Sequence, residues 1–196
     1  MATMVIHDRR LTGDTPAWYS FVMQVNNQTG IRHITETVAR RARQKRKLTK
    51  LHILCHGYEN NWDLGSGMCV PAAHGGFGLQ LGREGLNLFN YGLTSTWKGL
   101  VDEIVLFACA PADTYAGNVG TWGDGKRFCG YLALTTGAKV IAARDTQIYH
   151  YGGGGPIDFG AWEGPVYEYS DANPEGTRIL DPSRYHVHGS RQAAAA

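Results

Sequence analysis

A histidine and a cysteine each stand directly after a short apolar run in this sequence. His56 follows the run 51–55, and Cys109 follows the run 104–108. Short apolar runs bounded by polar or turn-forming residues are typical of buried parallel strands. A cysteine beside a histidine can attack an acyl group, because the imidazole can take up the thiol proton and later protonate the departing amine. His56 and Cys109 are therefore the candidate catalytic pair.

The residue after the candidate histidine is Gly57. Because glycine has no Cβ, its backbone N–H can come close to a substrate carbonyl and donate a hydrogen bond to the developing oxyanion. We expect the N–H of Cys109 to be the second oxyanion donor.

Alternating elements along the chain would position these residues. Apolar and β-branched runs predict strands at 18–25, 51–55, 77–81, 104–108 and 139–143. Apolar residues at helical spacing predict helices over 30–47, 86–100 and 126–136. Two further runs, 147–151 and 165–169, predict an antiparallel addition at one sheet edge. Since ligands bind outside the carboxyl ends of strands in open α/β sheets, both candidate residues fall where a site is expected.

In their order, the two strand-end motifs resemble the signature strands of caspase-like cysteine peptidases. The motifs are LHILCHG at 51–57 and EIVLFAC at 103–109. The segments LQLG at 79–82 and TGAKVIA at 136–142 resemble the CHAT branch of that clan. The resemblance covers 51–144 and implies a caspase-like three-layer sandwich. In such a fold, a mainly parallel central sheet is flanked by helices, here with a short antiparallel addition near the C-terminus.

The resemblance implies one caspase-like peptidase domain over 1–190, and we expect 191–196 to form a disordered tail. Its implied activity is that of a thiol endopeptidase with a Cys-His dyad. In that family the cysteine attacks and the histidine assists the leaving group, roles that fall on Cys109 and His56. No metal or other cofactor is implied.

Asp145 is the candidate substrate-binding residue that the resemblance suggests. An acidic pocket residue in separase-like and clostripain-like relatives would favour Arg or Lys before the cleaved bond by charge pairing. However, CHAT-like members commonly carry Trp-Asp-Val or a similar motif after the third strand, whereas this chain has ARDT at 143–146. Arg144 could neutralise Asp145 or itself select an acidic residue.

Composition restricts the partners that we expect. With 196 residues, 43% hydrophobic and 18% charged, the sequence is typical of one globular domain. A net charge of +2 gives no reason to expect nucleic acid, and we interpret the basic cluster 40–47 as a solvated helix end. The four cysteines form no CxxC pair, and the sequence has neither a run of about 20 apolar residues nor a secretory signal. We therefore expect a cytoplasmic protein that acts on a protein or peptide, without a membrane partner.

Two other function classes stay open from the sequence alone. A caspase-like fold whose site is catalytically silent would be an interaction module, although both catalytic residues are present here. A serine hydrolase would need a Gly-x-Ser-x-Gly elbow, and the spacing of the GSG at 65–67 differs from that motif.

Overall fold

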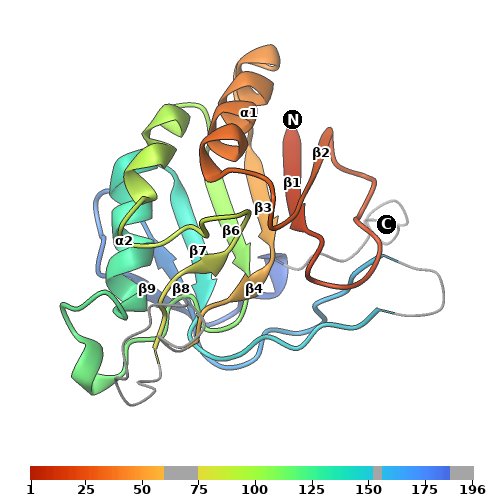
Figure 1. Cartoon of the computed structure of the whole chain (residues 1–196). Coiled ribbons are helices and arrows are strands. Elements are labelled where there is room, and N and C mark those ends of the chain that lie inside the picture. Colours follow the sequence, from red (N-terminus) through yellow and green to blue (C-terminus); the bar gives the residue numbers. More distant parts are fainter. Residues whose placement is uncertain (60–74, 152–155, 186–196) are drawn as a thin grey trace.

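A mixed, mostly parallel sheet forms the centre of the molecule in this computed structural model, which describes residues 1–59, 75–151 and 156–185. The sheet has seven strands in the order β2-β1-β3-β6-β7-β8-β9, and Figure 1 labels them along the chain. They are β1 (Thr3–Asp8), β2 (Phe21–Val25), β3 (Lys50–Leu54), β6 (Glu103–Phe107), β7 (Lys139–Ala143), β8 (Val166–Tyr169) and β9 (Thr177–Ile179). The first five strands in this order pair in parallel, whereas β8 pairs antiparallel with both β7 and β9. A separate two-stranded sheet joins β4 (His56–Gly57) to β5 (Leu79–Gln80).

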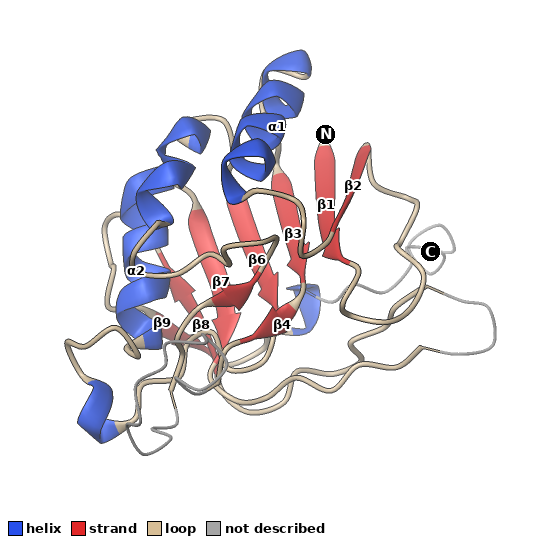
Figure 2. Cartoon of the chain, in the orientation of Figure 1, coloured by secondary structure: helices blue, strands red, loops and turns tan. Residues whose placement is uncertain are grey.

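Two α-helices cover one face of the sheet, as Figure 2 shows. They are α1 (Ile31–Gln44) and α2 (Gly125–Thr136), and between them lies the 3-10 helix η2 (Tyr91–Trp97). Their buried side chains form one core cluster with the strands. Two shorter 3-10 helices are η3 (Ala116–Asn118) and η4 (Ser183–Tyr185).

The opposite face of the sheet carries a second core cluster, and its covering differs from the expected helical layer. In the described part of the chain, segments without regular structure at 11–19, 149–151 and 156–162, together with η4, supply its apolar side chains. Ile157 and Phe159 are nearly fully buried there. The α/β fold with a mostly parallel sheet and an antiparallel C-terminal addition is thus confirmed, whereas the expectation of helices on both faces is wrong for these residues.

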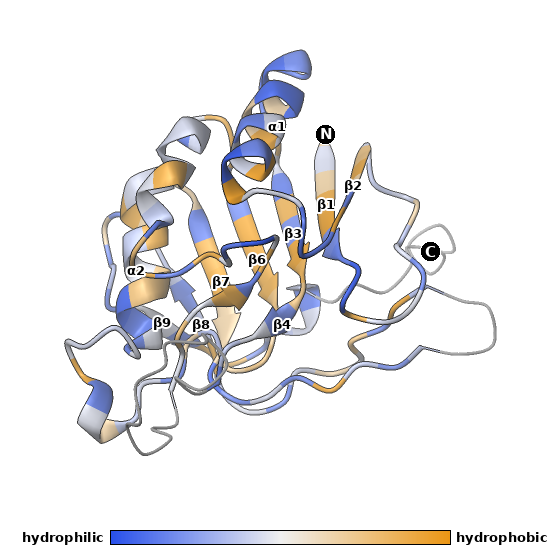
Figure 3. Ribbon diagram, viewed as in Figure 1, coloured by the Kyte–Doolittle hydropathy of each residue, from blue (hydrophilic) through white to orange (hydrophobic). Residues whose placement is uncertain are grey.

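The hydropathy pattern explains why these elements form. Figure 3 shows apolar strands at the centre and a polar outer surface on α1. The buried side of α1 includes Ile31, Ile34 and Val38, at the three- and four-residue steps of a helical stripe. Helix α2 begins where the Asp124 side chain accepts a hydrogen bond from the Arg127 N–H, and it ends at Gly137 with φ 66°.

The observed elements depart from the sequence-based boundaries at several places. The expected helix 86–100 is shortened to η2 because Asn87 and Asn90 bond to backbone N–H groups before it and form turns there. The expected strand 147–151 is absent from the described chain, and an isolated bridge joins His150 to Asp158 instead. Strands β1 and β9 have no counterpart among the predicted elements.

A buried histidine makes the stability of this fold sensitive to pH. His52 Nδ1 and the Tyr19 hydroxyl share a hydrogen bond, and burial lowers the pKa of His52 from 6.5 to about 3. Between these pH values the unfolded chain binds a proton that the folded chain excludes. The free energy of unfolding therefore decreases as the pH is lowered, by up to about 1.4 kcal/mol per pH unit.

We expect His52→Gln to flatten this dependence between pH 6.5 and 5, because glutamine can keep a hydrogen bond to Tyr19 without titrating in that range. Urea unfolding at several pH values measures the slope for the wild type and the variant. An equal slope in both proteins would show that His52 is not the group responsible.

Candidate active site

The ends of β3 and β6 bring His56 and Cys109 level with each other. The parallel register pairs Leu54 with Phe107, and the Cys55 N–H continues the ladder by donating to the Phe107 carbonyl at 3.2 Å. The side chains of Leu54 and Phe107 lie on the face away from α1 and α2. His56, two residues after Leu54, packs against Tyr149, which borders the core cluster of that same face.

Gly57 packs directly against the backbone of Cys109. A Cβ added to Gly57 would lie 1.8 Å from the Cys109 carbonyl oxygen and 3.0 Å from its nitrogen. Only a residue without a side chain fits there. The Gly57 N–H also donates a hydrogen bond to the Cys109 sulfur. The structure thus places one of the two expected oxyanion donors beside the candidate nucleophile.

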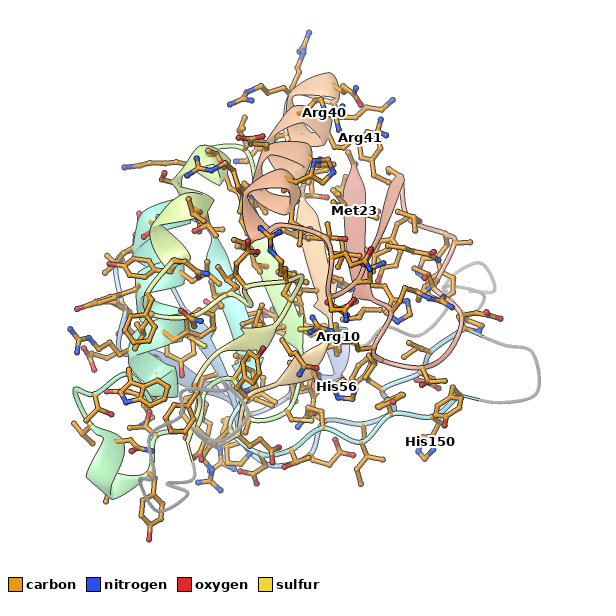
Figure 4. All side chains as sticks on the ribbon, in the orientation of Figure 1. Arg10, Met23, Arg40, Arg41, His56 and His150 are labelled. Atoms are coloured by element: carbon orange, nitrogen blue, oxygen red, sulfur yellow. The ribbon has the colours of Figure 1, made fainter. Side chains whose placement is uncertain are left out.

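The imidazole of His56 is held by the chain that follows β1. Figure 4 shows His56 and Arg10 as neighbours, and His56 Nε2 lies 3.2 Å from the Arg10 carbonyl oxygen. A carbonyl oxygen only accepts hydrogen bonds, so Nε2 carries the proton in this contact. In a neutral imidazole, Nδ1 is then the basic nitrogen. The ring of His56 also packs edge-on against Tyr149, with the ring centroids 6.4 Å apart.

A buried ion pair fixes the position of Arg10. Its guanidinium donates to the Asp8 carboxylate at 2.6 Å and to the carbonyls of Gln80 and Gly82 at 2.9 and 2.8 Å. Asp8 is fully buried and accepts further bonds from the N–H groups of Arg10 and Gly82. Asp8 and Arg10 therefore tie the end of β1 to the segment after β5. The sequence reasoning missed both residues, because their bonds to Gly82 join positions more than 70 apart in the chain.

Cys109 is half-buried and its thiol is neutral in this arrangement. Burial is the main cause that raises the pKa of Cys109, and the nearby Glu59 carboxylate raises it further. Backbone hydrogen bonding from Gln147 and from the Gly57 N–H acts in the opposite direction. Reaction of this thiol at neutral pH therefore requires a base that removes its proton.

The side chains of His56 and Cys109 make no hydrogen bond to each other, although the structure describes both residues. The structure brings the two backbones together, while His56 contacts Arg10 and Tyr149 and the sulfur of Cys109 contacts the segment after β7.

Ala110, the residue after Cys109, has a φ of 48°, a left-handed conformation that costs a non-glycine residue of order 1 kcal/mol or more. Strain of this kind is frequent at functional sites.

Asp145, the predicted substrate-binding residue, contacts the site with its backbone. Its carbonyl accepts the N–H of Ala110 at 3.2 Å. Its carboxylate forms an ion pair with Arg144 at 2.7 Å, with the two side chains 42% and 46% exposed, respectively. The neutralising role that Arg144 could play is therefore realised, whereas the contact of Asp145 with a substrate stays a prediction.

Where the structure describes them, the remaining cysteines and possible metal ligands form no metal site. Cys55 and Cys129 are buried free thiols whose pKa values burial raises. Over residues 1–59, 75–151 and 156–185, no group of three or more His, Cys, Asp or Glu side chains is arranged to hold a metal ion. Within the same ranges, no helix combines the length and the apolar character that crossing a bilayer requires. The GSG at 65–67, Cys69 and the expected tail 191–196 lie outside the described residues.

Comparison with known proteins yields no matching family model, no similar curated protein and no similar solved structure. The likeness to caspase-like peptidases therefore stays a prediction from the two strand-end motifs.

Proposed function

We propose that this chain is a caspase-like cysteine endopeptidase in which Cys109 attacks the peptide bond and His56 moves the proton. The fit of Gly57 against the Cys109 backbone is the observation that carries the proposal. It aims a backbone N–H at the sulfur, where the oxygen of an attacked carbonyl would also develop its charge. The serine-hydrolase alternative receives no comparable support from the described residues.

The reaction would run through an acyl-enzyme. Nδ1 of His56 takes the proton from the Cys109 thiol, and Sγ forms a bond to the substrate carbonyl carbon. The N–H groups of Gly57 and Cys109 donate to the oxyanion. When the carbon–nitrogen bond breaks, His56 returns the proton to the departing amine, and a water molecule then hydrolyses the thioester. The hydrogen bond from Nε2 to the Arg10 carbonyl would keep Nδ1 the basic nitrogen throughout.

Substrate binding would use the acidic character beside Cys109. A negative carboxylate near the cleaved bond favours a basic residue in the substrate by charge pairing. We therefore propose a protein or peptide substrate cleaved next to Arg or Lys.

A mixture of fluorogenic peptides with every residue type before the cleaved bond tests the activity. We expect turnover by the wild type and at least about a 100-fold loss of kcat in His56→Gln, because a general acid-base contributes about that much or more. Circular dichroism of the variant provides the folding control. Absence of cleavage across the whole mixture, or unchanged kcat in His56→Gln, would contradict the proposal.

One observation favours the catalytically silent interaction module as a second candidate. The neutral thiol of Cys109 has no hydrogen bond to the imidazole of His56, both being described residues. Since an apo site often tightens only when substrate binds, this geometry alone does not exclude catalysis. A silent module would lack turnover with every peptide while remaining fully folded.

A further inference from the structure

A second acidic residue, Glu59, contacts segments on both sides of the candidate nucleophile. Glu59 follows β4 two residues after Gly57, and its carboxylate contacts the Cys109 thiol. The same carboxylate accepts a hydrogen bond from the Thr146 hydroxyl. The Glu59 carbonyl accepts the Gly75 N–H at 2.9 Å, which anchors the backbone at this point. Glu59 thus bridges the end of β4 and the segment after β7 directly beside the sulfur.

The charge of Glu59 differs from that of the other acids around the site. Asp8 is paired with Arg10, and Asp145 is paired with Arg144. No salt bridge joins Glu59 to a basic side chain within the residues that the structure describes. Its partners there are a hydroxyl and a thiol, both of which are neutral. Glu59 is therefore the acid of this site whose negative charge lacks a cationic partner among the described side chains.

Resting on the proposed function, we propose that the Glu59 carboxylate is the specificity-determining group: it pairs with the cation of a basic substrate residue beside the cleaved bond. The substrate cation would neutralise the charge that opposes thiolate formation. Recognition of a basic residue and activation of the nucleophile would then be one event. A neutral peptide would bind without this activation.

Other ionisable groups also face the pair, so the effect of Glu59 must be separated from theirs. Cys55 interacts electrostatically with Cys109, and His56 and Tyr149 contact each other on the same face of the sheet. The Arg144–Asp145 ion pair follows β7, and the Asp113 N–H donates to the carbonyl of Ala110, the residue after Cys109. Glu59→Gln leaves every one of these groups in place.

The first test uses two sets of matched peptides, with the varied residue before the cleaved bond in one set and after it in the other. In each set, one peptide carries arginine and its match carries the neutral analogue citrulline. In one of the two sets, we expect the kcat/KM of the wild type for the arginine peptide to exceed that for the matched citrulline peptide at least about tenfold. A charge-assisted contact would give a difference of this size. Glu59→Gln keeps an oxygen that accepts the Thr146 hydroxyl and should lose this preference. Asp102→Asn, before β6 at the opposite end of the strand, is the control for the change in net charge.

Three results of the peptide test would overturn the assignment. One is an arginine preference that persists in Glu59→Gln. Another is loss of the preference in Asp145→Asn but not in Glu59→Gln, which would return the role to Asp145. Equal cleavage of both peptides by the wild type would also overturn it.

The second test needs no peptidase activity and therefore separates this inference from the proposed function. The rate at which iodoacetamide alkylates Cys109, followed by peptide mass spectrometry across pH, measures the apparent pKa of the thiol. Glu59→Gln should lower that apparent pKa by about one unit, which is about tenfold more thiolate at neutral pH. Added N-acetylarginine methylamide should lower it in the wild type and not in Glu59→Gln, while the citrulline analogue should have no effect.

The alkylation experiment decides the inference in every case. An apparent pKa that is the same in the wild type and Glu59→Gln, or an arginine analogue without effect on the wild type, would overturn the role of Glu59. If these shifts occur while no peptide is cleaved, Glu59 is a cation-binding group beside Cys109, and the peptidase proposal alone fails.

Discussion

Replacing Cys109 by alanine is expected to abolish peptide cleavage, with a loss of at least about 1,000-fold in kcat, because the acyl-enzyme of the proposed mechanism forms on its sulfur. The substitution removes one half-buried sulfur and should leave the fold intact, since the two strands that end at the site keep their ladder bonds. The measurement is the turnover of the best peptide from the mixture described above, with thermal unfolding as the folding control.

Thiol labelling by a peptide chloromethyl ketone provides an independent readout of the same variant. Cys55 and Cys129 are buried, so the label on the wild type should map to Cys109. Cys69 lies outside the described residues, and Cys69→Ala is therefore the matched control that should retain both turnover and label. Retained turnover in Cys109→Ala would refute the assignment of the nucleophile.

Gly57→Ala is expected to have the second largest effect, because it acts on both the fold and the site. The added methyl group would lie 1.8 Å from the Cys109 carbonyl oxygen, so the ends of β3 and β6 must separate. Overpacking of this kind typically costs about 1–3 kcal/mol of the free energy of unfolding. Because displacing an oxyanion donor costs about 100-fold or more in kcat, activity should fall further than the lost stability explains.

A control for this substitution exists in the same chain. Gly92, in η2, has no other atom within 4 Å of the place that a Cβ would take. Gly92→Ala should therefore keep full activity and nearly unchanged stability. A Gly57→Ala protein that unfolds at the wild-type urea concentration and retains its kcat would contradict the close contact with Cys109.

Much of the central sheet follows from local sequence pattern. The continuous apolar runs that end at Cys55 and Ala108 become β3 and β6, and the run 139–143 becomes β7 with the predicted bounds. A buried strand needs apolar side chains on both faces, so its signal lies in a few consecutive residues. The alternation of strand and helix then suffices to place the strand ends at one edge of the sheet.

Elements that depend on contacts distant in sequence escaped prediction. The short apolar run inside β1 resembles many surface segments, and its position between β2 and β3 comes from tertiary pairing. The segment 147–151 has strand-like composition, but the Gln147 side chain bonds instead to the backbone of Glu163 at 2.9 and 3.2 Å. Side-chain bonds of this type replace a regular ladder and have no periodic signature.

The candidate site shows the same division. His56, Gly57 and Cys109 belong to short motifs at strand ends and could be found from sequence. Glu59 and Arg10 could not, because their roles arise from contacts with residues 50 and 46 positions away in the chain, Cys109 and His56. Asp145 illustrates the reverse case, since its charge is visible in the sequence whereas its pairing with Arg144 depends on side-chain geometry.

The most direct test of the central claim is to trap the covalent intermediate. The wild type is mixed with an arginine peptide ester, quenched with acid within milliseconds to seconds, digested and mapped by mass spectrometry. We predict an acyl group on the peptide that contains Cys109, present in the wild type and in Cys69→Ala and absent from Cys109→Ala. An acyl group on a serine or another cysteine would contradict the account. So would ester turnover that occurs in both the wild type and Cys109→Ala without a trapped acyl-enzyme in either protein.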